Sequence, residues 1–320
     1  MSAALRAFMS GLIDYAGLFP PAGLEMPAAV AGYAGHRTLP EAWMLGRFLA
    51  PAEALPAFAA AAAPHLGAGQ RWRLAVLVGA RDDAGAAVAR CEAQGEMVAA
   101  LEDRTGGHAL VEVLETAVPP AAAGPGCAAF LESLLVALAD AGLAGRELYV
   151  ETPPGGDDRA VLDAIAAAQA RWAGPDGVFL RVGAKLRCGG LAAAAFPTPE
   201  RLAQVIATAG GLDLALKFTA GLHHPVRRRV ADPDVTMHGF LNVCGAAILV
   251  AAGRLGGDDL VACLTETEAD AFTFGEDRFA WRGHAADTAA VARARAGRVP
   301  GFGSCSFREP RDDLAALGLL

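Results

Sequence analysis

Two stretches in the second half of the chain alternate between hydrophobic and polar residues. Hydrophobic side chains fall on every second position in residues 178–187 and again in residues 212–219. Because successive side chains of a β-strand point to opposite faces, each stretch predicts a strand with one hydrophobic face. The opposite faces carry Arg181, Lys185 and Arg187 in the first strand, and Lys217 and Thr219 in the second.

Strand-like and helix-like segments alternate over most of the chain. Five earlier strands are predicted at residues 12–19, 43–49, 71–79, 109–115 and 147–151. Helices are predicted at residues 26–35, 52–65, 83–102, 126–141, 157–172, from 198 onward, 238–254 and 284–296. The eighth strand has two candidates, residues 237–243 and residues 271–274. We favour 271–274, because residues 238–254 have the length and the small side chains of a helix.

This order of elements indicates a fold class. Strands separated by helices of this length predict βαβ units and a parallel sheet. Seven or eight such units predict a (β/α)8 TIM barrel, a fold of ~250 residues. An open doubly wound sheet is the alternative, but no GxGxxG sequence follows the first strand. We therefore expect a single-domain barrel in residues 1–299, with a C-terminal extension in residues 300–320 whose short helix begins at Asp312.

The composition is that of a well-packed globular protein. Hydrophobic residues make up 54% of the 320 positions and charged residues 19%, which excludes a disordered chain. A formal net charge of −8 argues against nucleic acid as a partner. The N-terminus lacks the apolar core of a signal peptide, and the most apolar run, residues 239–255, is too short and interrupted to span a membrane. Together with six cysteines without CxxC spacing, these features predict a cytoplasmic protein with reduced thiols, and they are compatible with a homo-oligomer.

The polar faces of the strands indicate where a site would lie. In a TIM barrel one face of each strand packs on the helices, and the other fills the interior, with functional groups at the C-terminal ends. Because burying an unpaired charge costs several kcal/mol, charged groups at that mouth either pair with one another as a plug or serve a ligand. The side chains expected there are Glu151, Lys185, Arg187, Lys217 and Thr219, with Asp14, Arg47 and Glu112 nearby.

Two lysines on adjacent strands favour one particular chemistry. A lysine beside another cation in a partly dry pocket can be present as the neutral amine, which forms a Schiff base with an aldehyde or ketone. The strand positions make Lys185 and Lys217 neighbours, and Glu112 or Glu151 could carry protons. The simpler alternative is that both lysines bind an anionic substrate as point charges.

Each lysine begins a K-x-x-x-G sequence, at residues 185–189 and 217–221. Paired lysines on strands six and seven with glycine-containing loops resemble the class I, Schiff-base aldolase barrels of the deoxyribose-phosphate aldolase type. The resemblance implies that Lys185 is the nucleophile, Lys217 its partner and Glu112 the acidic group. The chain departs from that family in three places, namely Arg187, Cys188 and His223-His224-Pro225.

The loops after these two strands contain candidates for substrate binding. Gly189, Gly190 and Gly221 would let backbone N–H groups approach a phosphate or carboxylate, although an ordinary strand-to-helix turn is the alternative. His223 and His224 follow strand seven and are expected to flank the site.

His238 and Asn242 are spaced to share one helix face and complete the set of substrate-binding candidates. Together with Glu112, Glu151 or Asp14, the three histidines could form an N/O metal site. No HxH or HExxH sequence supports that metal site, and a general acid–base role for one histidine is the other interpretation.

The sequence thus predicts a lyase or aldolase-type enzyme that acts on a small anionic carbonyl compound through a lysine Schiff base, without a cofactor. Two alternatives stay open. The first is an isomerase or hydrolase that uses a divalent metal held by His and Glu residues. The second is a barrel that binds an anionic metabolite without turnover.

Overall fold

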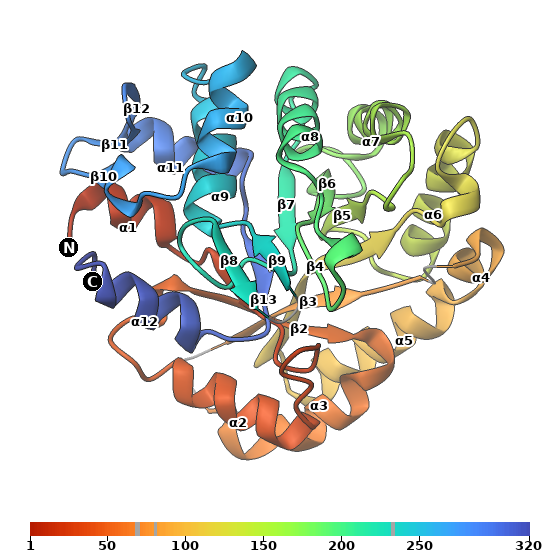
Figure 1. Cartoon of the computed structure of the whole chain (residues 1–320). Coiled ribbons are helices and arrows are strands. Elements are labelled where there is room, and N and C mark those ends of the chain that lie inside the picture. The colour runs from red at the N-terminus through yellow and green to blue at the C-terminus, as the bar shows by residue number, and fades with distance from the viewer. Residues whose placement is uncertain (68–70, 80–81, 232–233) are drawn as a thin grey trace.

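Eight parallel strands form a closed barrel at the centre of the molecule, which confirms the predicted (β/α)8 TIM barrel (Figure 1). The structure is a computed structural model that describes residues 1–67, 71–79, 82–231 and 234–320. The barrel strands are β1 (Ile13–Tyr15), β2 (Leu45–Pro51), β3 (Trp72–Leu77), β4 (Ala109–Ala117), β5 (Glu147–Glu151), β6 (Arg181–Arg187), β7 (Leu216–Thr219) and β13 (Phe302–Ser304). Around the barrel their order is β1, β13, β7, β6, β5, β4, β3, β2.

The alternation that predicted the strands also determines which side chains point outward. Val182, Ala184 and Leu186 of β6 belong to the hydrophobic core between the barrel and its helices. Residues of the other parity fill the interior, where Tyr149 of β5 is fully buried. A Cβ atom at Gly183 of β6 would lie 2.8 Å from the Tyr149 ring, so the glycine leaves room for the tyrosine. The small hydrophobic layer inside the barrel consists of Ala16, Leu49, Ala75, Val113, Tyr149 and Ala215.

The helices surround the barrel, as Figure 1 shows. They are α1 (Ala3–Met9), α2 (Met26–His36), α3 (Leu55–Ala62), α4 (Ala84–Ala89), α5 (Cys91–Arg104), α6 (Cys127–Asp140), α7 (Asp158–Trp172), α8 (Pro199–Gly211), α9 (Phe240–Ala251), α10 (Gly257–Thr265), α11 (Thr288–Gly297) and α12 (Arg308–Ala316). Several begin as the sequence predicts. The side chains of Asp157 and Thr198 accept hydrogen bonds from backbone N–H groups in the first turns of α7 and α8.

The eighth strand is not where the sequence predicted it. β13 closes the barrel by parallel pairing with both β1 and β7. Residues 271–274 instead contribute to β10 (Phe272–Phe274), which pairs antiparallel with β11 (Arg278–Trp281). Part of the segment 300–320, which we expected to be an extension, is therefore a strand of the barrel.

Two small sheets lie outside the barrel. A two-stranded antiparallel sheet of β8 (Arg228–Ala231) and β9 (Asp234–Met237) lies between β7 and α9 in the chain. The other sheet contains β10, β11 and β12 (His284–Asp287), and it packs on α1, where the Phe8 ring contacts Phe274 and Phe279. In Figure 1 this sheet, α1 and α12 lie on the same side of the barrel.

Three predicted helix starts need correction. α9 begins at Phe240, so His238 precedes the helix and does not share a helix face with Asn242. The segment predicted as a helix from residue 284 begins with strand β12, and α11 starts only at Thr288. The last helix starts at Arg308, one turn before the predicted Asp312.

Two further observations bear on the class of protein. All six cysteines are buried and free of disulfides, as predicted. In the described ranges, no helix combines the length and the apolarity that a membrane crossing requires.

Candidate functional site

The two lysines of the chain lie side by side inside the barrel. The sequence contains no lysine other than Lys185 and Lys217. They are paired in register on β6 and β7, and Glu151 of β5 is paired with Lys185 on the other side. The side chains of Lys185 and Lys217 are only 3% and 2% exposed. The interior orientation predicted for both lysines is therefore confirmed.

Carboxylates surround the two ammonium groups. Glu115 of β4 lies between them, with Oε2 2.5 Å from Lys185 Nζ and Oε1 2.6 Å from Lys217 Nζ. Asp14 of β1 is 2.5 Å from Lys217 Nζ, and Glu151 Oε2 is 3.1 Å from Lys185 Nζ. These residues form a continuous chain of charges, which we call the lysine cluster: Asp14, Lys217, Glu115, Lys185 and Glu151.

The pKa values in the lysine cluster differ from the sequence-based expectation, in which each lysine lowers the pKa of the other. Burial by itself would raise the pKa of Glu115, but Lys185 and Lys217 lower it to about 2. Burial would lower the pKa of Lys217, but Asp14 and Glu115 outweigh that effect and raise it. Lys217 is thus held as an ammonium ion, and Glu115 as a carboxylate.

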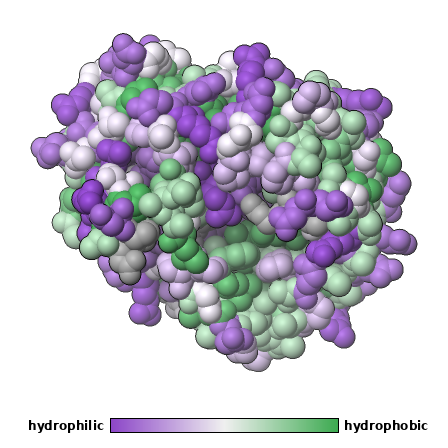
Figure 2. All heavy atoms as spheres, turned by 45° about the vertical axis from the view of Figure 1, so that its right-hand side comes forward, coloured by the Kyte–Doolittle hydropathy of each residue, from purple (hydrophilic) through white to green (hydrophobic). Residues whose placement is uncertain are grey.

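Lys185 also faces open space. A pocket of about 290 Å³ at the C-terminal mouth is lined by Lys185, and Lys217 does not line it. Figure 2 shows one face of the molecule, with a hollow near its centre and much of the hydrophobic surface below that hollow. The pocket has mainly apolar walls, and its lining includes Phe19, Pro20, Pro21, Leu49, Leu77 and Leu191. Its polar lining is Lys185, Arg187, Thr219, His223 and Ser304.

Arg187 stands above Lys185 on the same face of β6. The two residues are two positions apart, so their Cα atoms are separated by ~6.6 Å along the strand. The Arg187 side chain is 34% exposed, and its Nε lies 3.2 Å from Glu151 Oε1. Arg187 can therefore bind the anionic group of a ligand whose other end contacts Lys185.

A second pocket meets Lys185 from the side of β3 and β4. It has a volume of about 490 Å³, and its described lining includes Glu53, Gly79, Asp83, Glu115 and Lys185. The first pocket contains no carboxylate among its described lining residues, whereas this one contains several. Lys185 therefore stands at the boundary between two spaces of different polarity.

Glu112 and Arg47 do not lie at the mouth, contrary to prediction. The pairing of β3 with β4 skips one residue, because Leu74 pairs with Val111 and the next residue, Ala75, pairs with Val113. This bulge places both Val113 and Glu115 in the interior beyond Glu112. The sequence did not predict Glu115 as a site residue, because strict alternation starting from Glu112 would point the Glu115 side chain toward the helices.

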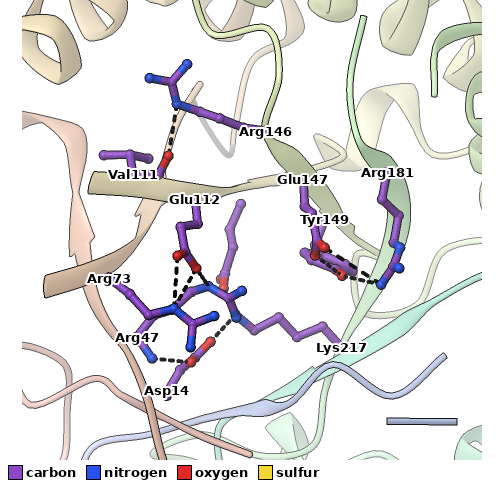
Figure 3. Close-up of polar contacts among 12 residues, drawn as sticks. Asp14, Arg47, Arg73, Val111, Glu112, Arg146, Glu147, Tyr149, Arg181 and Lys217 are labelled. Atoms are coloured by element: carbon purple, nitrogen blue, oxygen red, sulfur yellow. Dashed lines mark hydrogen bonds and ion pairs between the residues drawn. The ribbon is translucent and has the colours of Figure 1, made fainter. Parts of the chain in front are cut away.

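Glu112 belongs instead to a second cluster of charges at the opposite, N-terminal end of the barrel (Figure 3). Glu112 Oε2 lies 3.0 Å from Arg47 Nε and 2.8 Å from Arg73 Nε. In the same figure the hydroxyl of Tyr149 donates a 2.6 Å hydrogen bond to Glu147, next to Arg181. Asp14 connects the two ends, because it also accepts a 2.6 Å hydrogen bond from the backbone N–H of Arg47.

The three histidines predicted to act together have different partners in the structure. His223 lines the 290 Å³ pocket, and its Nδ1 lies 3.0 Å from Glu309 of α12. The neighbouring His224 makes an equivalent 2.7 Å contact with Asp313, but it does not line that pocket.

The other two substrate-binding candidates have structural partners. His238 is buried and its Nε2 contacts the carbonyl oxygen of Pro197 at 2.7 Å. The Asn242 amide donates to the carbonyl oxygens of Cys263 and Glu266, and its oxygen accepts from the backbone N–H of Arg227. His238 and Asn242 therefore hold loops in place, away from the pocket.

The glycine loops close one side of the pocket. Gly190 and Gly221 line it, and Gly189 packs against Gly221 so closely that a Cβ atom on either residue would lie 2.8 Å from the other's Cα. Gly221 and the preceding Ala220 both have positive φ, of 72° and 60°. For alanine this conformation is strained, and such strain is often found at functional sites.

The described residues of the site show no arrangement for a metal ion, and the sequence matches no known family model. Within the described part of the chain, no group of three or more His, Cys, Asp or Glu side chains is arranged to hold a metal ion. The carboxylates that a metal site would need at the mouth are paired with lysines and Arg187. No known family model and no curated protein matches this sequence.

Proposed function

We propose that the protein is a lyase that makes or breaks a carbon–carbon bond next to a carbonyl group, through a Schiff base on Lys185. The observation that carries this proposal is the unequal placement of the two lysines. Lys185 lines the pocket, whereas Lys217 lies beneath it between Asp14 and Glu115. A nucleophile must reach its substrate, and its charged partner need not.

The surroundings of Lys185 fit the steps of Schiff-base formation. The ammonium group first gives a proton to a carboxylate, and Glu151 at 3.1 Å from Nζ is in position to accept it. The neutral amine then adds to the carbonyl carbon, and the carbonyl oxygen leaves as water after protonation. The resulting cationic C=N group withdraws electrons from the bond between the α and β carbon atoms. When that bond breaks, its electron pair forms the C=C bond of an enamine and the C=N pair returns to the lysine nitrogen; bond formation is the reverse.

Lys217 and Glu115 maintain the charge balance during these steps. When Lys185 loses its proton, Glu115 is still neutralised by Lys217 at 2.6 Å. When the positive Schiff base forms, Glu115 and Glu151 stabilise it in place of the ammonium group. This division of roles agrees with the resemblance to the class I aldolase barrels in making Lys185 the nucleophile and Lys217 its partner. It assigns the acidic role to Glu115 and Glu151 rather than to Glu112.

Arg187 and the apolar walls indicate a small anionic substrate. Arg187 is the more exposed of the two cations that line the pocket, so we assign it to bind the anionic group of the substrate. Thr219 of β7 is paired in register with Arg187 of β6. Its hydroxyl lines the same pocket and can donate a hydrogen bond. A pocket of about 290 Å³ suits a metabolite of a few carbon atoms.

The test is reductive trapping. Sodium borohydride is added to the protein with each of a panel of carbonyl compounds: pyruvate, 2-oxobutyrate, acetoacetate, acetaldehyde and acetone. Intact mass and peptide mapping then identify the modified amine. We expect one adduct on Lys185, none on Lys217, and none on Lys185→Met beyond a background on the exposed N-terminal amine.

Lys217→Met is the matched control, because it removes the other lysine and keeps Lys185. We expect it to form the Lys185 adduct more slowly, since Glu115 then lacks its second cation. If no compound in the panel is trapped while Arg187-dependent binding of the same anions is seen by calorimetry, the protein is a binding barrel and the lyase proposal is wrong.

A further inference from the structure

A second reactive group lines the same pocket as Lys185. Among the described lining residues, only Lys185, Arg187, His223 and Cys305 can ionise. An arginine stays charged at all physiological pH values, and burial raises the pKa of the Cys305 thiol. The His223 imidazole is therefore the side chain of this lining, besides Lys185 itself, whose chemistry suits a general acid or base.

The carboxylates next to Lys185 are poor candidates for a second proton transfer. Both oxygens of Glu115 face ammonium groups, and the pKa of Glu115 is about 2, so it is a weak base. Glu151 contacts Lys185 through one oxygen and Arg187 through the other. Asp14 contacts Lys217 and the backbone of Arg47. These groups are bound to cations in the resting state, whereas His223 is not.

The C-terminal helix orients His223. Glu309 in the first turn of α12 lies 3.0 Å from Nδ1 of the ring. The backbone N–H of Glu309 donates to the Ser306 hydroxyl at 3.2 Å, and the Ser304 hydroxyl donates to the Ser306 carbonyl oxygen at 2.7 Å. The end of β13 thus fixes the start of α12, and with it the carboxylate that faces the imidazole.

This contact determines which nitrogen can act on a ligand. A carboxylate at Nδ1 favours the tautomer with the proton on Nδ1, which leaves the lone pair on Nε2. Over the ranges that the structure describes, Nε2 of His223 has no hydrogen-bond partner. The His223 side chain is 12% exposed, so it is held in the wall and still reaches the pocket. A carboxylate, an imidazole and a lysine on one small pocket are the parts that acid–base chemistry on a Schiff base requires.

We propose that His223, positioned by Glu309, removes the proton from the carbon atom next to the Schiff base on Lys185. The inference rests on the proposed function and narrows its substrate class to carbonyl compounds with a hydrogen atom on that carbon. In this step the C–H bond breaks, its proton moves to Nε2, and its electron pair forms a C=C bond. The C=N electron pair returns to the lysine nitrogen, so the cationic Schiff base becomes a neutral enamine. The reverse step returns the proton.

The test uses pyruvate as the probe, because its carboxylate suits Arg187 and its methyl protons exchange only through an enamine or enol. The protein is incubated with pyruvate in D₂O, and loss of the methyl signal is followed by proton NMR. In parallel, borohydride trapping measures formation of the Schiff base. We expect the wild type to catalyse both, and His223→Gln to retain trapping while exchange falls by ~100-fold or more.

His224→Gln is the matched control, because the adjacent imidazole has the same kind of carboxylate partner and does not line the pocket. We expect its exchange rate to equal that of the wild type. Glu309→Gln should slow exchange by ~10-fold, and Asp313→Asn should not. In His223→Ala, added imidazole should restore part of the exchange, which a merely structural role of His223 would not permit. Circular dichroism melting shows whether each variant is folded.

The outcomes separate the two proposals. Trapping on Lys185 with unchanged exchange in His223→Gln overturns the role of His223 and leaves the lyase proposal intact. Trapping and exchange that fall together in His223→Gln also overturn it, because the defect then precedes proton removal. Wild-type protein that traps pyruvate without exchanging its methyl protons has no base at that carbon, which contradicts the inference. Absence of trapping with the whole panel overturns both proposals.

Discussion

The interior of the barrel contains charges at both ends, but the two ends are built differently. At the N-terminal end, Glu112 and Glu147 lie beside arginines, and the Glu112–Arg73 pair is partly exposed to solvent. At the C-terminal end, the charges are lysines and carboxylates that are almost fully buried below a pocket. Arginine holds its proton under all ordinary conditions, whereas a buried lysine can lose it. The N-terminal cluster therefore carries fixed charges, whereas the lysine cluster is where the proposed function places proton transfer.

The largest expected difference between the ends is in stability. Glu115→Gln leaves two buried ammonium groups without the carboxylate between them, and breaking a buried ion pair costs about 3–5 kcal/mol. Glu112→Gln removes one partly exposed carboxylate from two arginines and should cost less than about 1 kcal/mol. Urea denaturation at pH 7, followed by circular dichroism, measures both. Equal losses of unfolding free energy in the two variants would mean that the charges of the lysine cluster interact no more strongly than those of Glu112 with its arginines.

The second expected effect is on acid stability. The pKa of Glu115 is about 2 in the folded protein, below the ordinary value of 4.5. A depressed pKa stabilises the fold above the unfolded value, and that contribution is lost as the pH falls from about 4.5 toward 2. The difference corresponds to on the order of 3 kcal/mol.

The measurement compares the free energy of unfolding of wild type and Glu115→Gln between pH 6 and 2. The gap between them should narrow below pH 4.5. His36, whose pKa is lowered to about 4 by burial, adds a separate loss at somewhat higher pH, but both proteins contain it. A gap that is constant over the whole range would show that Glu115 titrates normally.

A smaller effect is expected on ligand affinity. Arg187→Met removes the exposed cation of the pocket, and a hydrogen bond to a charged group contributes about 1.5–3 kcal/mol. The pyruvate concentration for half-maximal trapping should rise by ~10–100-fold, whereas that for acetone should hardly change. Arg73→Met, at the other end of the barrel, is the control and should affect neither. Equal losses for pyruvate and acetone would mean that Arg187 does not receive the anionic group.

The smallest expected effect is a difference in reactivity between the two lysines. Reductive methylation with formaldehyde should modify Lys185 several-fold faster than Lys217, because Lys185 lines the 290 Å³ pocket and Lys217 does not. Peptide mass spectrometry over a time course gives both rates, and protein unfolded in urea gives the reference in which they are equal. Faster modification of Lys217 would contradict the assignment of the nucleophile.

The sequence predicted the barrel and the lysines for a simple physical reason. β5, β6 and β7 follow strict alternation, so the parity of Lys185, Lys217 and Glu151 could be read directly. Alternation failed at β4, because one skipped residue in its pairing with β3 moves Glu115 into the interior. Nothing in the residues 109–117 signals such a bulge, since it depends on the neighbouring strand.

Two further features could not be predicted, also for physical reasons. β13 has three residues, of which Gly303 has no side chain, so its alternation is too short to recognise. The contacts of His223 and His224 with α12 join residues 86 and 89 positions apart, and no local pattern encodes them. His238 does not share a helix face with Asn242 because α9 begins at Phe240, a start that the Gly-Phe sequence indicates only weakly.

The position of β13 in the chain has a consequence for biosynthesis. Asp14 and Lys217 belong to β1 and β7, the two strands between which β13 inserts, and their ion pair spans 203 positions of sequence. Until residues 302–304 have left the ribosome, the barrel has an open seam beside Lys217, and the buried carboxylates are exposed to water there. Contacts between such distant segments form slowly, so we expect closure of this seam to be a late and slow step of folding.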